Sequence, residues 1–279
     1  MSTEEPSRSA NCAPSRGSEA REPAGPPRGR ASESETRASS SEPRAWADHT
    51  STTQRRTHIK ICGITRVDDA RAAIDAGADA IGLVFWSGTP RVVTHAQARA
   101  IVAAVPAFVT VVGLFVDPNA DEVRAALDAL PIDLLQFHGR EPASFCRAFG
   151  RRYLKAIPVR DGIDLLESVS PYGDAAGLLF DAFSEGDLPG GTGRAFDWGR
   201  LTADVRARLP APLILSGGLD ASNVGRAIAA VAPWGVDVSS GVEERGSDGR
   251  PRRGLKDAAR IRAFVEGVRI ADGGTPATA

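Results

Sequence analysis

"HIKICGITRVDDARAAIDAGADAIGLVF", from His58 to Phe85, contains a strand-like run, a helix-like run and a second strand-like run. The helix-like run ends at Gly77, a residue type that often terminates helices. The two flanking runs are almost continuously apolar, as in parallel strands that are covered on both faces. This stretch therefore predicts a strand–helix–strand unit whose two strands are parallel.

The same alternation continues along the chain. Further strand-like runs are "FVTVVGLFV", "IDLLQFHG", "RYLKAIPV", "AGLLFDAF", "PLILSGG" and "GVDVSSGVE", each followed by a helix-like run. Eight such units predict an α/β fold, a closed (β/α)8 barrel, for which about 250 residues is typical. A doubly wound sheet is the alternative, but its first turn would favour GxGxxG, and this chain has "CGIT" there.

Composition divides the chain into a tail and a folded part. Residues 1–57 are rich in Ser, Arg, Glu, Pro and Gly and poor in aliphatic residues, so they bury too little apolar surface to offset their ordering entropy. We expect 1–57 to be a disordered tail, 58–270 to form the barrel and 271–279 to be a second disordered tail. A docking or regulatory arm is the alternative for the first segment.

Charge and cysteine content exclude several function classes. The formal net charge is -1 and the pI is about 6.5, which gives no electrostatic argument for nucleic acid or an anionic membrane. No apolar run approaches the roughly 20 residues needed to span a bilayer. Cys12, Cys62 and Cys146 are odd in number and form no CxxC pair, which favours a reducing compartment. We expect a cytoplasmic protein, monomeric or homodimeric, that acts on a small molecule.

Two residues at strand ends are candidates for acid–base chemistry, because the strand ends of such a barrel share one mouth. Cys62 ends the first strand, and Asp181 ends the sixth in "LLFDAF". A thiol with a depressed pKa can accept a proton, and a carboxylate after four apolar residues needs a partner or a place at the mouth. A small buried hydrophobe remains the alternative for Cys62, and it is the interpretation that we give Cys146.

Glycine and serine residues follow the last two predicted strands. Adjacent glycines let backbone N–H groups approach an anion, and a helix that starts there adds its positive dipole end. The turns after strands seven and eight are the recurrent phosphate site of these barrels. We predict phosphate binding, with plain tight turns as the alternative, at Gly217, Gly218, Ser239, Ser240 and Gly241.

From His58 to its last predicted helix, the chain resembles the phosphoribosylanthranilate isomerases of tryptophan biosynthesis. The resemblance rests on motifs that fall at the expected strand ends in the expected order: "KICGIT", "DAIGLVF", "PRVV", "QFHG", "LLFDAF…GGTGRAFDW", "LSGGLDASNV" and "GVDVSSGVE…GLKD".

This resemblance implies an Amadori rearrangement of N-(5-phosphoribosyl)anthranilate, a phosphosugar, without a metal or organic cofactor. Asp181 matches the general acid that protonates the ribose ring oxygen, and Cys62 matches the general base that removes the C2 proton. Arg91 matches the arginine that meets the anthranilate carboxylate. His138 either contacts substrate or holds the barrel rim, and residues 190–193 match a loop that could close over substrate.

The chain departs from the family pattern in two places. "LVFWSGTP" carries Trp86 and Gly88 in the loop before Arg91, where they could alter substrate packing. The segment 244–253 is longer and more basic than the family's short turn, and we interpret it as a solvated surface loop.

Three other functions remain open. An indole-glycerol-phosphate synthase would need a strand-end lysine, whereas Lys60 and Lys155 lie inside predicted strands and outside synthase-like motifs. A histidine-pathway isomerase would have an aspartate where Cys62 stands. A phosphate-ligand sensor on the same fold would need neither Cys62 nor Asp181.

Overall fold

The computed structural model of the 279-residue chain describes residues 56–182 and 196–273. Within them, eight parallel strands form a closed barrel in chain order, and β1 pairs with both β2 and β8. The predicted (β/α)8 barrel is confirmed. The strands are β1 (His58–Cys62), β2 (Ala80–Val84), β3 (Thr110–Phe115), β4 (Leu134–Phe137), β5 (Tyr153–Val159), β6 (Gly177–Ala182), β7 (Leu213–Leu215) and β8 (Gly235–Val238).

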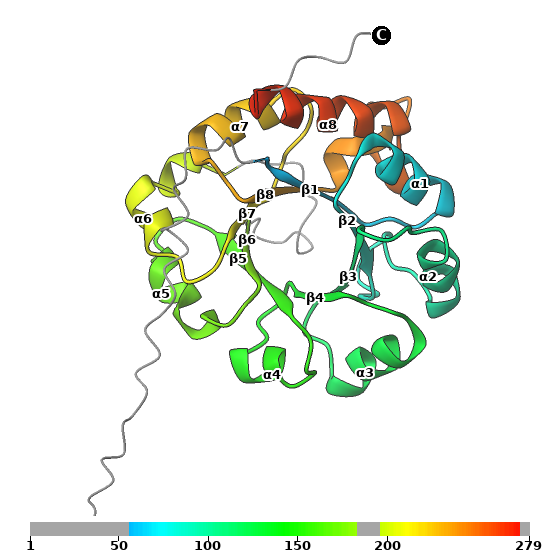
Figure 1. Cartoon of the computed structure of the whole chain (residues 1–279), viewed down its shortest axis with the longest axis horizontal. Coiled ribbons are helices and arrows are strands. Elements are labelled where there is room, and N and C mark those ends of the chain that lie inside the picture. The colour runs from blue at the N-terminus through cyan, green and yellow to red at the C-terminus, as the bar shows by residue number, and fades with distance from the viewer. Residues whose placement is uncertain (1–55, 183–195, 274–279) are drawn as a thin grey trace, which may run out of the picture. The chain divides into compact units, whose positions relative to one another are not determined.

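A ring of helices surrounds the barrel (Figure 1). The α-helices are α1 (Val67–Ala76), α2 (His95–Val102), α3 (Ala120–Ala129), α4 (Ala143–Arg147), α5 (Leu165–Val169), α6 (Ala203–Ala207), α7 (Val224–Val231) and α8 (Ala258–Ala271). Short 3-10 helices are η2 (Ser170–Tyr172), η3 (Trp198–Arg200) and η4 (Ser240–Val242).

Local sequence explains where several helices begin and end. Thr94 accepts a hydrogen bond from the backbone of Gln97, whose side chain bonds back to Thr94, and this capping box starts α2. Asn119 does the same for α3. Gly77 ends α1 with φ 98, a left-handed conformation that glycine adopts without steric cost.

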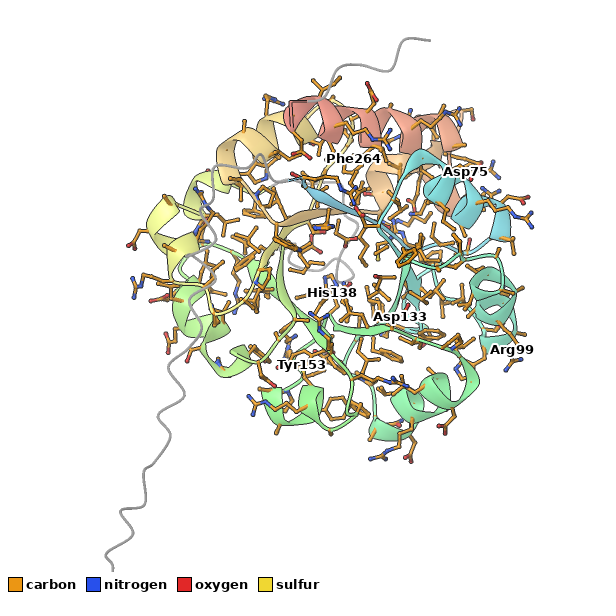
Figure 2. All side chains as sticks on the ribbon, in the orientation of Figure 1. Asp75, Arg99, Asp133, His138, Tyr153 and Phe264 are labelled. Atoms are coloured by element: carbon orange, nitrogen blue, oxygen red, sulfur yellow. The ribbon has the colours of Figure 1, made fainter. Side chains whose placement is uncertain are left out.

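Strand alternation separates an apolar layer from a polar interior. Ile59 and Ile61 of β1 belong to the core between strands and helices, whereas Lys60 and Cys62 lie on the other face of the strand, inside the barrel. Figure 2 shows His138 inside the ring of strands and Arg99 on the outer helices. Burying one large side chain of the apolar layer, such as Phe137, contributes about 1.5–3 kcal/mol.

The basic segment that we expected to be a loop is instead a hairpin. β9 (Glu243–Arg245) and β10 (Pro251–Lys256) form a separate two-stranded antiparallel sheet. The backbone N–H of Arg250 donates to the Asp248 carboxylate, and Gly249 has φ 73. Both features are typical of a turn that reverses the chain direction, which the basic composition of the segment did not indicate. Most of the hairpin side chains between its two ends are solvent-exposed.

The two ends of the described barrel meet each other. Thr57 is 4 % exposed and donates backbone and side-chain hydrogen bonds, each 2.7 Å long, to the carboxylate of Asp272. The described residues 56–57 and 271–273 belong to the segments that composition assigns to the tails, and α8 includes Ala271. The other residues of those segments, 1–55 and 274–279, lie outside the described ranges. No helix in 56–182 or 196–273 combines the length and the apolar character that crossing a membrane requires.

Candidate active site

A cavity of about 50 Å³ lies where the strands end, and it gathers most of the predicted site residues. Cys62, Arg91, His138, Asp181 and Ser239 all line it. The strand ends therefore share one mouth, as the barrel interpretation requires. The other lining residues are Val84, Trp86, Thr89, Leu114, Ser216 and Asp237.

Asp181 ends a chain of hydrogen-bonded side chains that begins deeper in the barrel. Nε2 of Gln136 lies 3.0 Å from Nδ1 of His138, and Nε2 of His138 lies 3.0 Å from Oδ2 of Asp181. If Gln136 donates to Nδ1, the neutral imidazole carries its proton on Nε2 and donates it to Asp181. The backbone N–H of Ala182 donates to Oδ1 of Asp181 at 2.9 Å. The carboxylate is thus held in one orientation by contacts on both oxygens.

Cys62 is 6 % exposed and sits among charged groups. Burial raises the pKa of its thiol, as does the negative charge of Asp237, whereas the ammonium groups of Lys60 and Lys256 lower it; the net direction is upward. This is opposite to the depressed pKa that makes a thiol a ready proton acceptor near neutral pH. The physical cause is the apolar contact with Val84 and Leu114, with which Cys62 forms a small interior cluster.

Arg91 takes part in a buried ion-pair network with the β9–β10 hairpin. Its Nε and Nη2 donate to the two oxygens of Glu243 at 2.7 and 3.0 Å, a bidentate geometry. Lys256 Nζ lies 3.3 Å from Glu243, and the Gly254 N–H donates to the same carboxylate at 2.9 Å. Burial raises the pKa of Glu243, but Arg91 and Lys256 outweigh burial and lower it overall. Glu243 thus fixes Arg91 through Nε and Nη2, and within 56–182 and 196–273 no hydrogen bond engages Nη1.

The predicted phosphate turns lie against each other and against Asp181. Gly217 and Gly218 have φ 83 and 64, which favour glycine. A Cβ on Gly217 would lie 2.8 Å from Oδ1 of Asp181, and one on Gly241 would collide with the carbonyl oxygen of Leu219. These glycines therefore allow close backbone approach. They do not themselves line the described cavity, which reaches this side through Ser216 and Ser239.

Comparison with known proteins identifies the family. The family model described as N-(5'phosphoribosyl)anthranilate (PRA) isomerase matches residues 59–267. The chain belongs to this family. The N-(5'-phosphoribosyl)anthranilate isomerase of Pseudomonas aeruginosa strain UCBPP-PA14 is 54 % identical over 211 residues, which is 76 % of this chain and 94 % of the relative.

Solved members of the family have the same fold. Phosphoribosyl anthranilate isomerase from Thermotoga maritima is 33 % identical, with a TM-score of 0.68 over 76 % of this chain and 98 % of that one. A phosphoribosyl anthranilate isomerase in complex with reduced 1-(o-carboxyphenylamino)-1-deoxyribulose 5-phosphate is 33 % identical, with a TM-score of 0.65 and the same coverage. The isomerase of tryptophan biosynthesis that the motifs predicted is confirmed.

Several residues of this isomerase site were not assigned from the sequence. Asp237 and Ser216 line the cavity, and Glu243 holds Arg91 from outside it. Asp237 did carry a signal, because it precedes Ser239 by two residues in the strand-like run "GVDVSSGVE", where alternate residues share a face. Glu243 carried none, because its partner is 152 positions away in the chain.

The loop that departs from the isomerase pattern places Trp86 at the mouth. Trp86 lines the cavity beside Thr89, and a Cβ on Gly88 would collide with its indole ring. Trp86 and Gly88 therefore act as a pair, since the missing side chain makes room for the ring. The loop 190–193, expected to close over substrate, lies outside the described residues.

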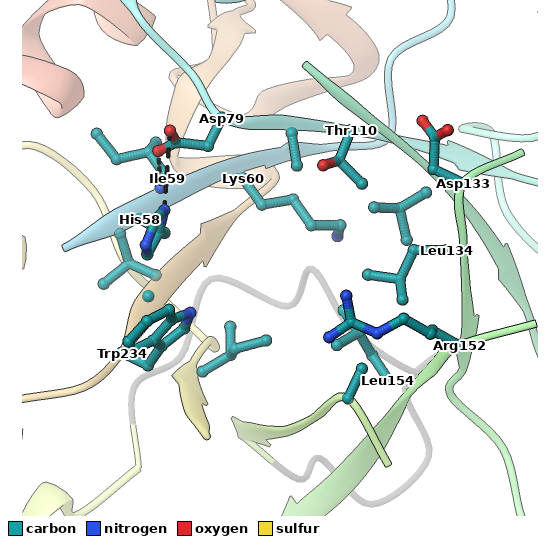
Figure 3. Close-up of a pocket in the computed structure, with 16 residues that line it drawn as sticks. His58, Ile59, Lys60, Asp79, Thr110, Asp133, Leu134, Arg152, Leu154 and Trp234 are labelled. Atoms are coloured by element: carbon teal, nitrogen blue, oxygen red, sulfur yellow. Dashed lines mark hydrogen bonds and ion pairs between the residues drawn. The ribbon is translucent and has the colours of Figure 1, made fainter. Parts of the chain in front are cut away.

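A second and larger cavity, about 300 Å³, lies at the opposite end of the isomerase barrel (Figure 3). It is lined by residues at the starts of the strands, including His58, Asp79, Asp133, Arg152 and Trp234. None of the predicted site residues lines it. Among the described residues, size therefore does not single out the predicted active-site cavity.

Proposed function

We propose that this chain converts N-(5-phosphoribosyl)anthranilate to 1-(2-carboxyphenylamino)-1-deoxyribulose 5-phosphate, with Asp181 as general acid and Cys62 as general base. One observation carries the assignment of these roles: a thiol from β1 and a carboxylate from β6 line a single small cavity together with Arg91. Family membership supplies the reaction. Because Cys62 and Asp181 line the same cavity, one can accept a proton from the substrate while the other donates one to it.

The first step is ring opening. Asp181 gives a proton to the ribose ring oxygen, the C1–O bond breaks, and the nitrogen lone pair forms a protonated Schiff base at C1. His138 contacts Oδ2 of Asp181 at 3.0 Å, which suits a positioning residue that keeps the acid aimed at the ring. This hydrogen bond supports the interpretation of His138 as a strand-end residue that holds the barrel rim, and direct contact with substrate stays a prediction.

The second step is removal of the C2 proton. The Cys62 thiolate takes this proton, the bonding electrons form a C1–C2 double bond, and the iminium nitrogen becomes neutral. The resulting enolamine loses its hydroxyl proton and gains one at C1 to give the ketone, so the reaction is a net isomerisation. Because burial raises the pKa of Cys62, turnover should increase with pH as the thiol ionises.

Substrate orientation follows from groups at the rim of the same cavity. Arg91, fixed by Glu243 through Nε and Nη2, offers Nη1 to the anthranilate carboxylate. The backbone of Gly217, Gly218 and Ser240 offers N–H groups to the phosphate. A relative bound to a reduced 1-deoxyribulose 5-phosphate compound supports a ligand of this shape in the family.

The environment of the protein follows from the same proposal. The proposed steps move protons between the substrate and the chain's own side chains. Cys62 and Cys146 are free thiols, which suits the cytoplasm as the compartment.

The lysines that a synthase would need as acids are each paired, Lys60 with Asp237 at 2.8 Å and Lys155 with Glu141 at 3.0 Å, and this favours the isomerase.

The direct test is turnover of phosphoribosylanthranilate by the purified full-length chain, followed by the loss of anthranilate-type fluorescence. The Cys62→Ala/Asp181→Asn double variant serves as the blank for spontaneous breakdown of the substrate. We expect saturable turnover well above that blank. A folded protein that does not exceed the blank would contradict the proposal, as would retention of a phosphosugar ligand without turnover, which would indicate a sensor.

A further inference from the structure

One buried charge beside the proposed base has no role in the steps above. Lys60 lies two residues before Cys62 in β1, so both side chains point into the barrel. The Lys60 side chain is 7 % exposed, and its Nζ donates to Oδ1 of Asp237 at 2.8 Å. Lys60 lines the cavity at the starts of the strands, and Asp237 lines the one at their ends. The pair therefore lies between the two cavities. Figure 3 shows the Lys60 side chain in the cavity at the strand starts.

A glycine brings the ammonium group and the thiol together. Gly82 of β2 is the register partner of Cys62. A Cβ on Gly82 would lie 2.8 Å from Sγ of Cys62 and 3.2 Å from Nζ of Lys60. Both atoms thus border the same small space, which exists because the strand has no side chain there. A lysine charge at this range acts on the thiol through a barrel interior with little water to screen it.

We infer that Lys60 is a positioning residue for the isomerase reaction: anchored by Asp237, it holds a positive charge against Cys62 and favours the thiolate that accepts the C2 proton. The inference rests on the proposed role of Cys62. Asp237 has a double effect, since it keeps the lysine in place and charged while its own negative charge opposes the thiolate. The ionisation of the thiol releases its proton to solvent.

The charges around Cys62 agree with this assignment. Lys60 is the largest influence that lowers the pKa of the thiol, and Lys256 adds to it from β10. Burial lowers the pKa of Lys60, but Asp237 and Cys62 outweigh burial and raise it overall, so the ammonium keeps its charge. The other ionisable groups that line the Cys62 cavity are Arg91, His138 and Asp181.

The test is the pH dependence of Cys62 alkylation by iodoacetamide, a neutral reagent, with peptide mass spectrometry to separate Cys62 from Cys12 and Cys146. In Lys60→Met, we expect the midpoint of alkylation to move upward by about one to three pH units, the usual effect of an opposite charge at short range. Lys155→Met is the matched control, because it removes another buried ammonium paired with a carboxylate, Glu141, and it should leave the midpoint unchanged.

A second variant keeps the test decisive if Lys60→Met fails to fold around an unpaired Asp237. Lys60→Met/Asp237→Asn removes both charges, and the midpoint should still move upward, though less, because the lysine effect exceeds that of the aspartate. An unchanged or lowered midpoint in the folded variants would overturn the inference.

Turnover measured on the same variants separates this inference from the proposed function. If alkylation shifts and the pH profile of kcat shifts with it, both stand. If alkylation shifts but the kcat profile does not, Lys60 still controls the thiol, and Cys62 is not the base.

Discussion

The two ends of the barrel use charged residues in different ways. At the starts of the strands, Asp79 accepts from the backbone N–H of Ile59 and Asp133 accepts from that of Val111, each at 2.8 Å. At the ends of the strands, Asp181 and Glu243 accept from the side chains of His138 and Arg91. Asp79 and Asp133 at the first end each satisfy a backbone N–H of a neighbouring strand, whereas Asp181 and Glu243 at the second end also orient the side chains His138 and Arg91.

This difference explains why the larger cavity is not the proposed active site. Its carboxylates are occupied by the strand backbone, and Trp234 stacks on His58 with ring centroids 4.9 Å apart. The smaller cavity joins a thiol, a carboxylate and a guanidinium. Chemistry requires groups that face each other and can change protonation, and volume alone supplies neither.

The largest expected effect is at the ends of the strands. Cys62→Ala and Asp181→Asn should each lower kcat about 10²-fold to 10⁴-fold, the usual range for a lost general base or acid. The double variant should be far less damaged than the product of the two losses, because both groups serve one sequence of steps. Steady-state turnover, with circular dichroism as the folding control, measures this. A near-normal kcat in folded Cys62→Ala would show that Cys62 contributes only to packing and is not the general base.

A smaller effect is expected at the rim of the same cavity. Arg91→Gln should raise KM about tenfold to a hundredfold and change kcat less, because the contact with the substrate carboxylate is made in ground and transition states alike. Arg252→Gln is the control, since this arginine pairs with Glu244 on the exposed hairpin. A collapse of kcat with unchanged KM would assign Arg91 to the chemistry instead.

At the opposite end, we expect a change in stability without a change in catalysis. Asp79→Asn should lower the free energy of unfolding by about 1 kcal/mol at neutral pH, since the side chain is 24 % exposed and solvent screens part of its interactions. The kcat/KM should stay unchanged. Asp75→Asn, an exposed position on α1, is the control for charge removal alone.

The same variant has a defined pH dependence. Burial raises the pKa of Asp79, but hydrogen bonds from His58, the Ile59 N–H and Arg56 outweigh burial and lower it below its usual 3.8. The stabilisation is therefore present above pH 3.8 and lost as pH falls through the lower folded value. Urea unfolding of both proteins should give curves that converge in acid. A difference in unfolding free energy between the two proteins that persists or grows at acid pH would show that ionised Asp79 is not the source of the stabilisation.

The smallest effect is expected from removal of residues 1–55. A chain that begins at Arg56 keeps the contact of Arg56 with Asp79 and that of Thr57 with Asp272, both at the end of the barrel where the strands start. Turnover and the midpoint of thermal unfolding should match those of the full-length protein. A clear loss of either in the soluble truncated protein would favour the docking or regulatory arm over the passive tail.

Local pattern was sufficient for the fold and for the residues at the strand ends. The alternation of apolar runs and capped helices predicted eight strands, and the position of Cys62 and Asp181 at strand ends placed both at one mouth. The pattern suffices because alternation and capping are short-range properties, and because the ends of parallel strands in a closed barrel must lie on the same side.

Partners that are distant in the sequence were decided only by the tertiary structure. The pairs Lys60–Asp237 and Arg91–Glu243 join residues 177 and 152 positions apart. The sequence of the hairpin that carries Glu243 predicts a solvated loop, because exposed strands lack the apolar pattern by which strands are recognised. The upward direction of the Cys62 pKa likewise depends on burial and on the charge of Asp237 in β8, which outweigh the nearby Lys60 and which the sequence around Cys62 does not reveal. Sequence thus determined which residue types stand at the strand ends, and barrel closure determined which of them touch, because electrostatic contacts depend on distance in space and not along the chain.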